Sequence, residues 1–175
     1  MLASAAVLEF TLHHGFNCSV DRFWVLFFDP QWTRELILEG LGFATCDIDP
    51  VVEADGKKRR SMRVTPKLDI PAAIAKLLGP KLGYTENGRF DLATSEWSYE
   101  IVLSVLADRI RMGGRVRVDP DGPDRCTRHS TLFCEVKIFG VGGLVEKAAE
   151  KNMRDGWEKA AVWMRSWLTT EAAAK

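Results

Sequence analysis

The chain of 175 residues is long enough for one globular domain that buries a core of its own. Its composition, 46% hydrophobic and 27% charged, is that of a soluble protein. Lysine plus arginine and aspartate plus glutamate number 24 each, so the net charge is zero. Binding to nucleic acid draws on a surplus of positive charge, and we therefore expect no nucleic-acid partner.

The cysteines lie far apart in the sequence and form neither a Cys-x-x-Cys pair nor a zinc-ligand spacing with histidine. No apolar run reaches the ~20 residues that span a bilayer. Residues 1–8 lack the basic start and the length of a signal peptide. We therefore expect a cytoplasmic protein with no metal or other cofactor, and reduced thiols at Cys18, Cys46, Cys126 and Cys134.

The first forty residues predict a strand followed by two short helices. Apolar and polar side chains alternate over residues 8–16, the period of a strand. Ser19 is a typical N-cap for a helix over 20–28. Pro30 ends that helix and suits the first position of a second helix over about 30–40.

After the second helix the sequence keeps a period of two, which predicts consecutive antiparallel strands. Asp55-Gly56 is a strong hairpin signal, and residues 68–79 have the pattern of a short capped helix. A long helix with one apolar stripe is expected over about 144–168. We expect one domain, residues 1–170, and a tail, 171–175, with the composition of a helical spacer. The strands predicted in this region are 42–54, 57–66, 82–93, 96–106, 108–119 and 125–139.

One strand, two short helices, six further strands and one long helix make an α+β layout. Within this order, residues 10–16, 69–71, 82–88, 108–114 and 140–146 carry a family resemblance. They are similar to a bacterial branch, of unknown function, of the START-like (SRPBCC, helix-grip) superfamily. That superfamily includes plant allergens of the birch-pollen type, lipid-transfer domains and aromatic cyclases. The resemblance covers nearly the whole chain. It implies a seven-stranded curved antiparallel sheet around the long C-terminal helix, with a hydrophobic ligand cavity between them.

Alternation also assigns the side chains of each strand to two faces. Met62, Tyr99 and Met112 fall on apolar faces, whereas the arginines of 108–119 fall on the opposite face. Methionine is flexible and suits ligands of variable shape, although apolar residues at this spacing also form ordinary cores. The residues predicted to line a ligand pocket are His14, Phe27, Arg60, Met62, Glu86, Trp97, Tyr99, Met112, Met153 and Trp157.

Polar residues on otherwise apolar faces are His14, Arg60 and Glu86. A buried charge must be paired or must contact a ligand group. One hypothesis is that Arg60 and Glu86 form the polar end of the pocket and orient a ligand head group. His14 or Tyr99 would complete that polar end. The alternatives are an internal ion pair, or strand ends at which these side chains reach water.

Other chemistries find little support in the sequence. His13 and His14 are neighbours on a strand and point to opposite faces, which argues against a metal site. There is no nucleophile elbow and no phosphate-binding glycine loop. Residues 140–143 are interpreted as a flexible corner before the long helix rather than as an anion site. The basic outer face of 108–119 is interpreted as a solvated surface that pairs with carboxylates such as Glu135.

Three functions stay open. The first is binding or carriage of a hydrophobic, lipid-like small molecule, with the apolar helices around Trp24 and Phe27 as core, as a lid or as a transient membrane contact. The second is a cyclase or dehydratase-type enzyme acting on a polyketide-like substrate, for which His14, Glu86 and Tyr99 offer acid and base groups together with Arg60. The third is an interaction domain with a filled core. The oligomeric state is not determined by the sequence.

Overall fold

The computed structural model describes residues 7–174. Residues 1–6 of the predicted domain and residue 175 of the predicted tail lie outside the described residues. The strands are β1 (Leu8–Phe16), β2 (Thr45–Ile48), β3 (Val52–Ala54), β4 (Lys57–Thr65), β5 (Tyr84–Asp91), β6 (Glu96–Leu103), β7 (Ile110–Pro120) and β8 (Cys126–Val136). The helices are α1 (Val20–Phe28), α2 (Pro30–Glu35), the π-helix η1 (Leu36–Gly40), α3 (Ala72–Leu78) and α4 (Gly142–Ala173).

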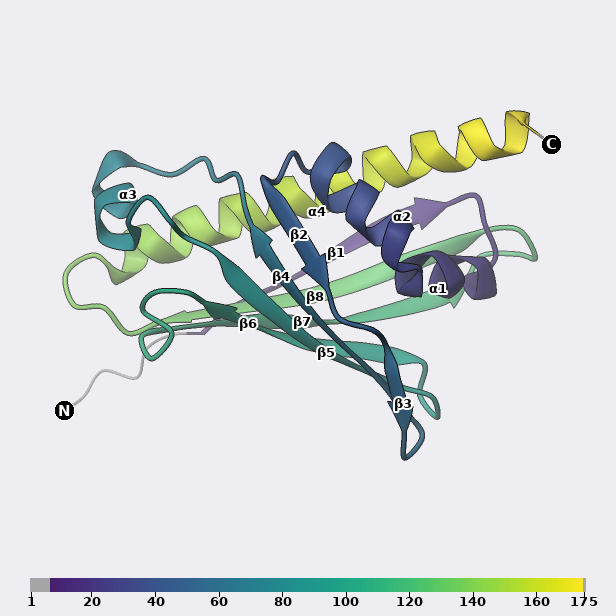
Figure 1. Cartoon of the computed structure of the whole chain (residues 1–175), viewed down its shortest axis with the longest axis horizontal. Coiled ribbons are helices and arrows are strands. Elements are labelled where there is room, and N and C mark those ends of the chain that lie inside the picture. Colours follow the sequence, from purple (N-terminus) through teal and green to yellow (C-terminus); the bar gives the residue numbers. More distant parts are fainter. Residues whose placement is uncertain (1–6, 175) are drawn as a thin grey trace.

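The strands form one antiparallel sheet in the order β1-β8-β7-β6-β5-β4-β2, and β3 also pairs with β4. The sheet is curved, and α4 runs along one face of it (Figure 1). The short helices α1 and α2 lie towards the C-terminal end of α4, and α3 lies near its N-terminal end (Figure 1). The α+β helix-grip fold predicted from the sequence is therefore confirmed.

The sheet has eight strands rather than the predicted seven. The predicted strand 42–54 is interrupted, because β2 ends at Ile48 and β3 begins at Val52. Pro50 lies between them and has no N–H to donate to the ladder. Since β2 and β3 both pair with β4, the two short strands share one edge of the sheet.

The two short helices begin at side-chain caps, of which the one at Ser19 was predicted. The Ser19 hydroxyl accepts a 3.2 Å hydrogen bond from the first turn of α1, and the Asp29 carboxylate accepts a 2.8 Å hydrogen bond from the first turn of α2. The second helix keeps α geometry only to Glu35 and then widens into η1. A Cβ at Gly40 would lie 2.8 Å from Cγ of Trp163, so glycine allows η1 to approach α4 closely.

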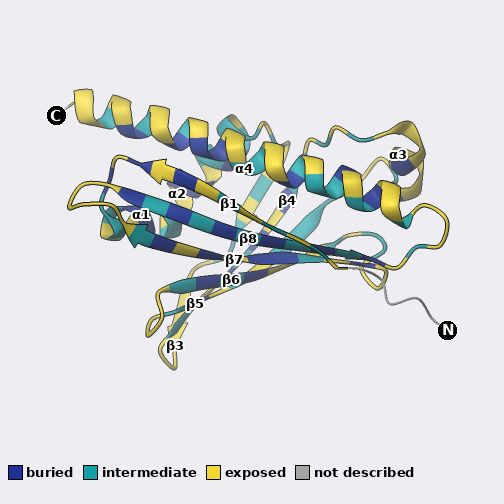
Figure 2. Cartoon of the chain, turned by 180° about the vertical axis from the view of Figure 1, so that it is seen from behind, coloured by how far each residue is buried: buried dark blue, intermediate teal, exposed yellow. Residues whose placement is uncertain are grey.

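Helix α4 is longer than predicted. It begins at Gly142 and continues to Ala173, beyond the predicted end at 168 and into the segment predicted as a tail. An ion pair between Arg22 of α1 and Glu171 links its last turns to the rest of the domain. The buried side chains of α4 form a stripe that faces the sheet (Figure 2), and they are Val145, Ala148, Met153, Ala160, Ala161, Met164 and Leu168.

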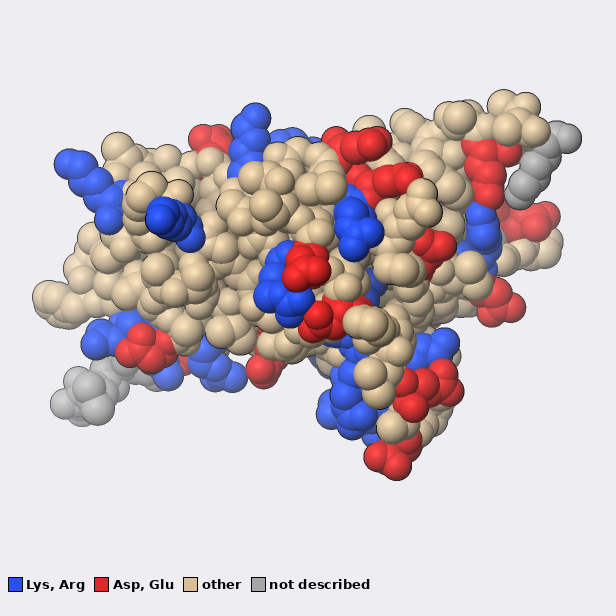
Figure 3. Space-filling model, in the orientation of Figure 1, with Lys and Arg blue, Asp and Glu red and all other residues tan. Residues whose placement is uncertain are grey.

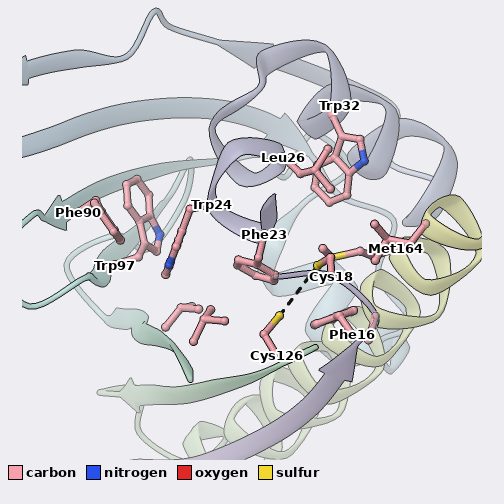
Figure 4. Close-up of a cluster of buried hydrophobic side chains, with 14 of the residues drawn as sticks. Phe16, Cys18, Phe23, Trp24, Leu26, Trp32, Phe90, Trp97, Cys126 and Met164 are labelled. Atoms are coloured by element: carbon pink, nitrogen blue, oxygen red, sulfur yellow. Dashed lines mark hydrogen bonds between the residues drawn. The ribbon is translucent and has the colours of Figure 1, made fainter. Parts of the chain in front are cut away.

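The core near α1 is rich in aromatic residues (Figure 4). Phe23 of α1 and Trp97 of β6 are both buried in this cluster, together with Met164 of α4. Cys18 and Cys126 meet there with their sulfur atoms 4.0 Å apart, and both thiols are free. Phe23, Trp97 and Met164 also line the space between the sheet and α4.

Candidate ligand cavity

A cavity of about 260 Å³ lies between the sheet and α4. Most of the side chains in its wall are aliphatic or aromatic. Along α4 the wall extends from Val145 to Met164, about 28 Å of helix at 1.5 Å per residue, so the cavity is elongated. Its volume is slightly below the roughly 300–1,000 Å³ that is common for ligand sites. These dimensions favour a slim ligand over a two-chain lipid.

Every residue predicted to line the pocket is found in the cavity wall except His14. The alternation of buried and exposed side chains along β4, β6 and β7 is the reason, because residues two apart share a face. Their role as ligand contacts stays a prediction. The predicted residues in the wall are Phe27, Arg60, Met62, Glu86, Trp97, Tyr99, Met112, Met153 and Trp157.

Arg60 and Glu86 form an ion pair in this wall. Nη2 of Arg60 lies 3.6 Å from Oε1 of Glu86, and the side chains are 4% and 17% exposed. The register of β4 and β5 pairs Met62 with Glu86, so the two charges are diagonal neighbours on the inner face. The Arg60 guanidinium donates to the Phe27 carbonyl and lies 5.1 Å from the Trp97 ring centroid. The charge of Arg60 is therefore balanced inside the protein, which is the ion-pair alternative considered from the sequence.

The pKa values of acidic groups in the cavity wall are raised, among them those of Glu86 and Tyr99. Burial raises the pKa of the Glu86 carboxyl above its ordinary value, although the charge of Arg60 opposes this shift. Burial raises the pKa of the Tyr99 phenol as well, and the charge of Glu86 adds to the effect. A Cβ at Gly114 would lie 2.8 Å from the Tyr99 hydroxyl, so glycine gives this side chain room on the inner face of the sheet.

Arg128 of β8 is a second buried cation in the wall, and it was not predicted from the sequence. Only 5% of the residue is exposed, and no ion pair among residues 7–174 includes it. Its Nη2 lies 2.9 Å from Nδ1 of His14 and 3.3 Å from the Trp157 carbonyl oxygen. The guanidinium also lies 4.5 Å from the Trp157 ring centroid. Burial lowers the pKa of Arg128 to about 9, so the side chain stays charged at neutral pH.

His14 connects Arg128 to the surface. Arginine only donates hydrogen bonds, so Nδ1 of His14 accepts from Arg128, and Nε2 carries the proton. Nε2 donates to Oε2 of Glu158 on α4 at 3.0 Å, and that carboxylate is 59% exposed. The prediction that His14 lines the pocket is therefore corrected. His14 lies outside the cavity wall and accepts a hydrogen bond from Arg128.

The sequence did contain a signal for Arg128. Burial alternates along the whole of β8, and Arg128 shares its inward face with Ser130 and Leu132. The residues predicted to line the pocket include none from β8. A charged residue on the apolar, inward face of a strand is the same signal that indicated Arg60.

The arrangement around His14 predicts a pH-dependent stability. Burial, then the charge of Arg128, lowers the pKa of His14 from its ordinary value of 6.5, and Arg165 adds to this while Glu158 opposes it. The unfolded chain therefore takes up the proton first, and stability is lost as the pH falls from about 6.5 through the folded pKa. We expect the free energy of unfolding, measured with urea, to decrease from pH 7.5 to pH 5.5 by up to about 1.4 kcal/mol per pH unit from this group. His14→Gln should flatten this part of the profile; an unchanged slope would assign the dependence to another group.

The outer face of the sheet carries paired charges, as interpreted from the sequence. Arg111 of β7 lies 3.1 Å from the Glu135 carboxylate of β8. Arg63 of β4 contacts both Asp47 and Asp49, each at 2.7 Å. In the view of Figure 3, basic and acidic side chains lie side by side at the hairpin of β3 and β4. This surface is a solvated, cross-paired one rather than a cationic patch.

Comparisons with known proteins place the chain in a family. Residues 11–168 match the family described as "Protein of unknown function (DUF2505)". The chain belongs to the DUF2505 family. No curated protein matches its sequence significantly.

Solved structures with 13–17% sequence identity share the fold of this DUF2505 protein. The aromatase/cyclase ZhuI from Streptomyces sp. R1128 is 13% identical with a TM-score of 0.62, over 91% of this chain and 94% of the other. A START superfamily protein from Mycobacterium smegmatis is 17% identical with a TM-score of 0.61, over 93% and 98%. Norcoclaurine synthase from Thalictrum flavum is 17% identical with a TM-score of 0.57, over 92% and 88%. The resemblance of this DUF2505 chain to the START-like superfamily is thereby confirmed at the level of the fold.

Proposed function

We propose that this DUF2505 protein binds or carries a hydrophobic small molecule in the cavity between the sheet and α4. The observation that supports this most directly is an elongated space of about 260 Å³ with mainly apolar walls. Removing apolar ligand surface from water would supply the binding free energy, at about 25 cal/mol per Å² of buried area. The same space argues against the filled-core interaction domain.

The relatives that share the fold are in line with this proposal. ZhuI is an aromatase/cyclase, and norcoclaurine synthase has been solved in complex with dopamine and hydroxybenzaldehyde. Small organic molecules are thus ligands of this fold in at least one relative. Whether the DUF2505 protein only carries its ligand or also transforms it is a matter for experiment.

The test is native mass spectrometry of the freshly purified protein, followed by organic extraction and identification of released molecules. We expect a bound mass, or, for protein purified without one, saturable binding of a fluorescent fatty acid. Ala149→Phe should weaken that binding, because Ala149 lines the cavity. Val162→Phe is the matched control, since Val162 is 53% exposed on α4 and lies outside the wall. A protein without a bound mass and without fatty-acid binding would contradict the proposal.

An enzyme is the second candidate, and the raised pKa of Glu86 favours it. The Glu86 carboxyl lies in the cavity wall together with the buried Tyr99 phenol, and a carboxyl whose pKa is raised by burial is a candidate general acid. Mass spectrometry of the ligand after incubation with the protein separates the two functions. A ligand recovered unchanged favours carriage, whereas a product that disappears with Glu86→Gln favours catalysis.

Cellular location and membrane contact remain predictions. None of the helices within residues 7–174 combines the length and the hydrophobicity that crossing a bilayer requires. The cytoplasmic location expected from the sequence, and the transient membrane contact that it left open as an alternative, can both be examined by fractionation of cells that produce the protein.

A further inference from the structure

We infer that the ligand is a single-chain amphiphile with a carboxylate head group, and that Arg128 binds this carboxylate inside the cavity. The inference rests on the proposed function and adds the chemical class of the ligand and its anchor. It also moves the anchor away from the pair Arg60 and Glu86, where the sequence had suggested it.

The first step is the balance of charge in the cavity wall. Both arginines of the wall are almost fully buried, with 6% of Arg60 and 5% of Arg128 exposed. Arg60 has the carboxylate of Glu86 at 3.6 Å. No carboxylate among residues 7–174 forms an ion pair with Arg128, and the nearest acidic side chain in its network, Glu158, is separated from it by His14. A buried cation without a counter-ion is costly, and a bound anion would offset that cost.

The second step is the hydrogen bonding of the Arg128 guanidinium. Its Nη2 is used by His14 and by the Trp157 carbonyl. Its Nε is buried and has no partner among the described residues, and no hydrogen bond within residues 7–174 uses Nη1. Arginine carries five N–H donors in a rigid plane that matches a carboxylate. The Nε–H group points to the side of Nη2, which the protein already uses, so the two N–H groups of Nη1 are the donors that remain for a carboxylate oxygen of the ligand.

The third step is that the guanidinium is held in place before any ligand arrives. It lies 4.5 Å from the Trp157 ring centroid and 5.2 Å from that of Phe16. His14 and the Trp157 carbonyl fix one of its terminal nitrogens. Because these contacts already hold the guanidinium in one position, little conformational entropy is lost when an anion binds.

The fourth step is the shape of the space beyond Arg128. From Trp157, the wall follows α4 back to Val145 over about 18 Å of helix. At that far end the wall is apolar and includes Ile74 and Leu78 of α3. A head group at Arg128 would thus leave a narrow apolar channel for an unbranched chain.

The experiment measures displacement of a fluorescent fatty acid by palmitate, hexadecanol and hexadecyl phosphate, which share one chain and differ in head group. With the wild-type protein we expect palmitate to compete at roughly 10- to 100-fold lower concentration than hexadecanol, the range of a charge-assisted hydrogen bond. Arg128→Met should remove this preference while hexadecanol still binds. Arg117→Met is the matched control, because Arg117 is 58% exposed on β7 and lies outside the cavity wall.

The outcomes distinguish failure of the proposed function from failure of the carboxylate anchor. If none of the three compounds binds, the proposed function itself fails. If palmitate and hexadecanol compete equally with the wild-type protein, hydrophobic binding stands and the carboxylate anchor is overturned. A clear preference for hexadecyl phosphate would overturn the carboxylate class. Should Arg128→Met not fold, Arg128→Lys keeps the charge and loses the planar fork, and it is expected to retain only part of the preference.

Discussion

Replacing Glu86 with leucine is expected to lower the free energy of unfolding by about 3–5 kcal/mol, because the change leaves the Arg60 charge buried without its carboxylate. In the wild-type protein the two groups lie 3.6 Å apart, and the Arg60 side chain is only 4% exposed. Its remaining partners are the Phe27 carbonyl and, at 3.5 Å, the Thr33 hydroxyl. Neither carries a charge that balances the guanidinium. Urea denaturation at pH 7.5 measures the effect.

The control for this prediction is the double variant Arg60→Met with Glu86→Leu. Apolar residues of similar volume often replace a buried ion pair without loss, so the double variant should recover most of the stability lost in Glu86→Leu. A single variant that loses less than about 1 kcal/mol would mean that water in the cavity screens the charges. The Glu86 side chain is 17% exposed, so water can reach part of it.

Trp97→Ala is expected to destabilise the protein by about 3–5 kcal/mol, the range for removing a large aromatic side chain from a core. Trp97 is 1% exposed, and its ring centroid lies 5.2 Å from that of Phe27. A Cβ at Gly88 would lie 1.7 Å from this indole, so the ring packs directly against the backbone of Gly88 and fills the space that a side chain there would need. Removing the ring also takes away an aromatic surface next to Arg60.

The control lies on the same strand. Val102 of β6 is 45% exposed, and Val102→Ala should change the free energy of unfolding by less than about 0.5 kcal/mol. Both variants are measured by urea denaturation with circular dichroism. A loss below about 2 kcal/mol for Trp97→Ala would contradict the prediction, and would show that Phe27 and its neighbours move into the space that the indole leaves.

Several features of the fold followed from local pattern. Period-two alternation identified the strands and their inward faces, and the apolar stripe identified α4 as the helix that covers the sheet. Ser19 and Pro30 marked the starts of the first two helices. One exception has a local cause as well, since Pro50 divides the predicted strand 42–54.

The length of α4 was harder to predict because contacts beyond its own sequence stabilise its end. The last turns carry alanine and glutamate, which are compatible with a helix or with a spacer. The ion pair between Arg22 and Glu171 joins residues that are far apart in the chain. Periodicity within one segment carries no information about such a contact.

The sequence by itself determined the fold class, the inward side chains of the strands, and the presence of polar residues on apolar faces. These follow from alternation and spacing, which depend only on neighbouring residues. The tertiary structure alone decided that Arg60 is paired with Glu86 and that Arg128 has no carboxylate partner among residues 7–174. It also decided that His14 lies between Arg128 and Glu158, which is 144 positions away from His14 in the sequence. The charge partner of a buried side chain depends on strand register and on where α4 crosses the sheet, and only the folded chain fixes both.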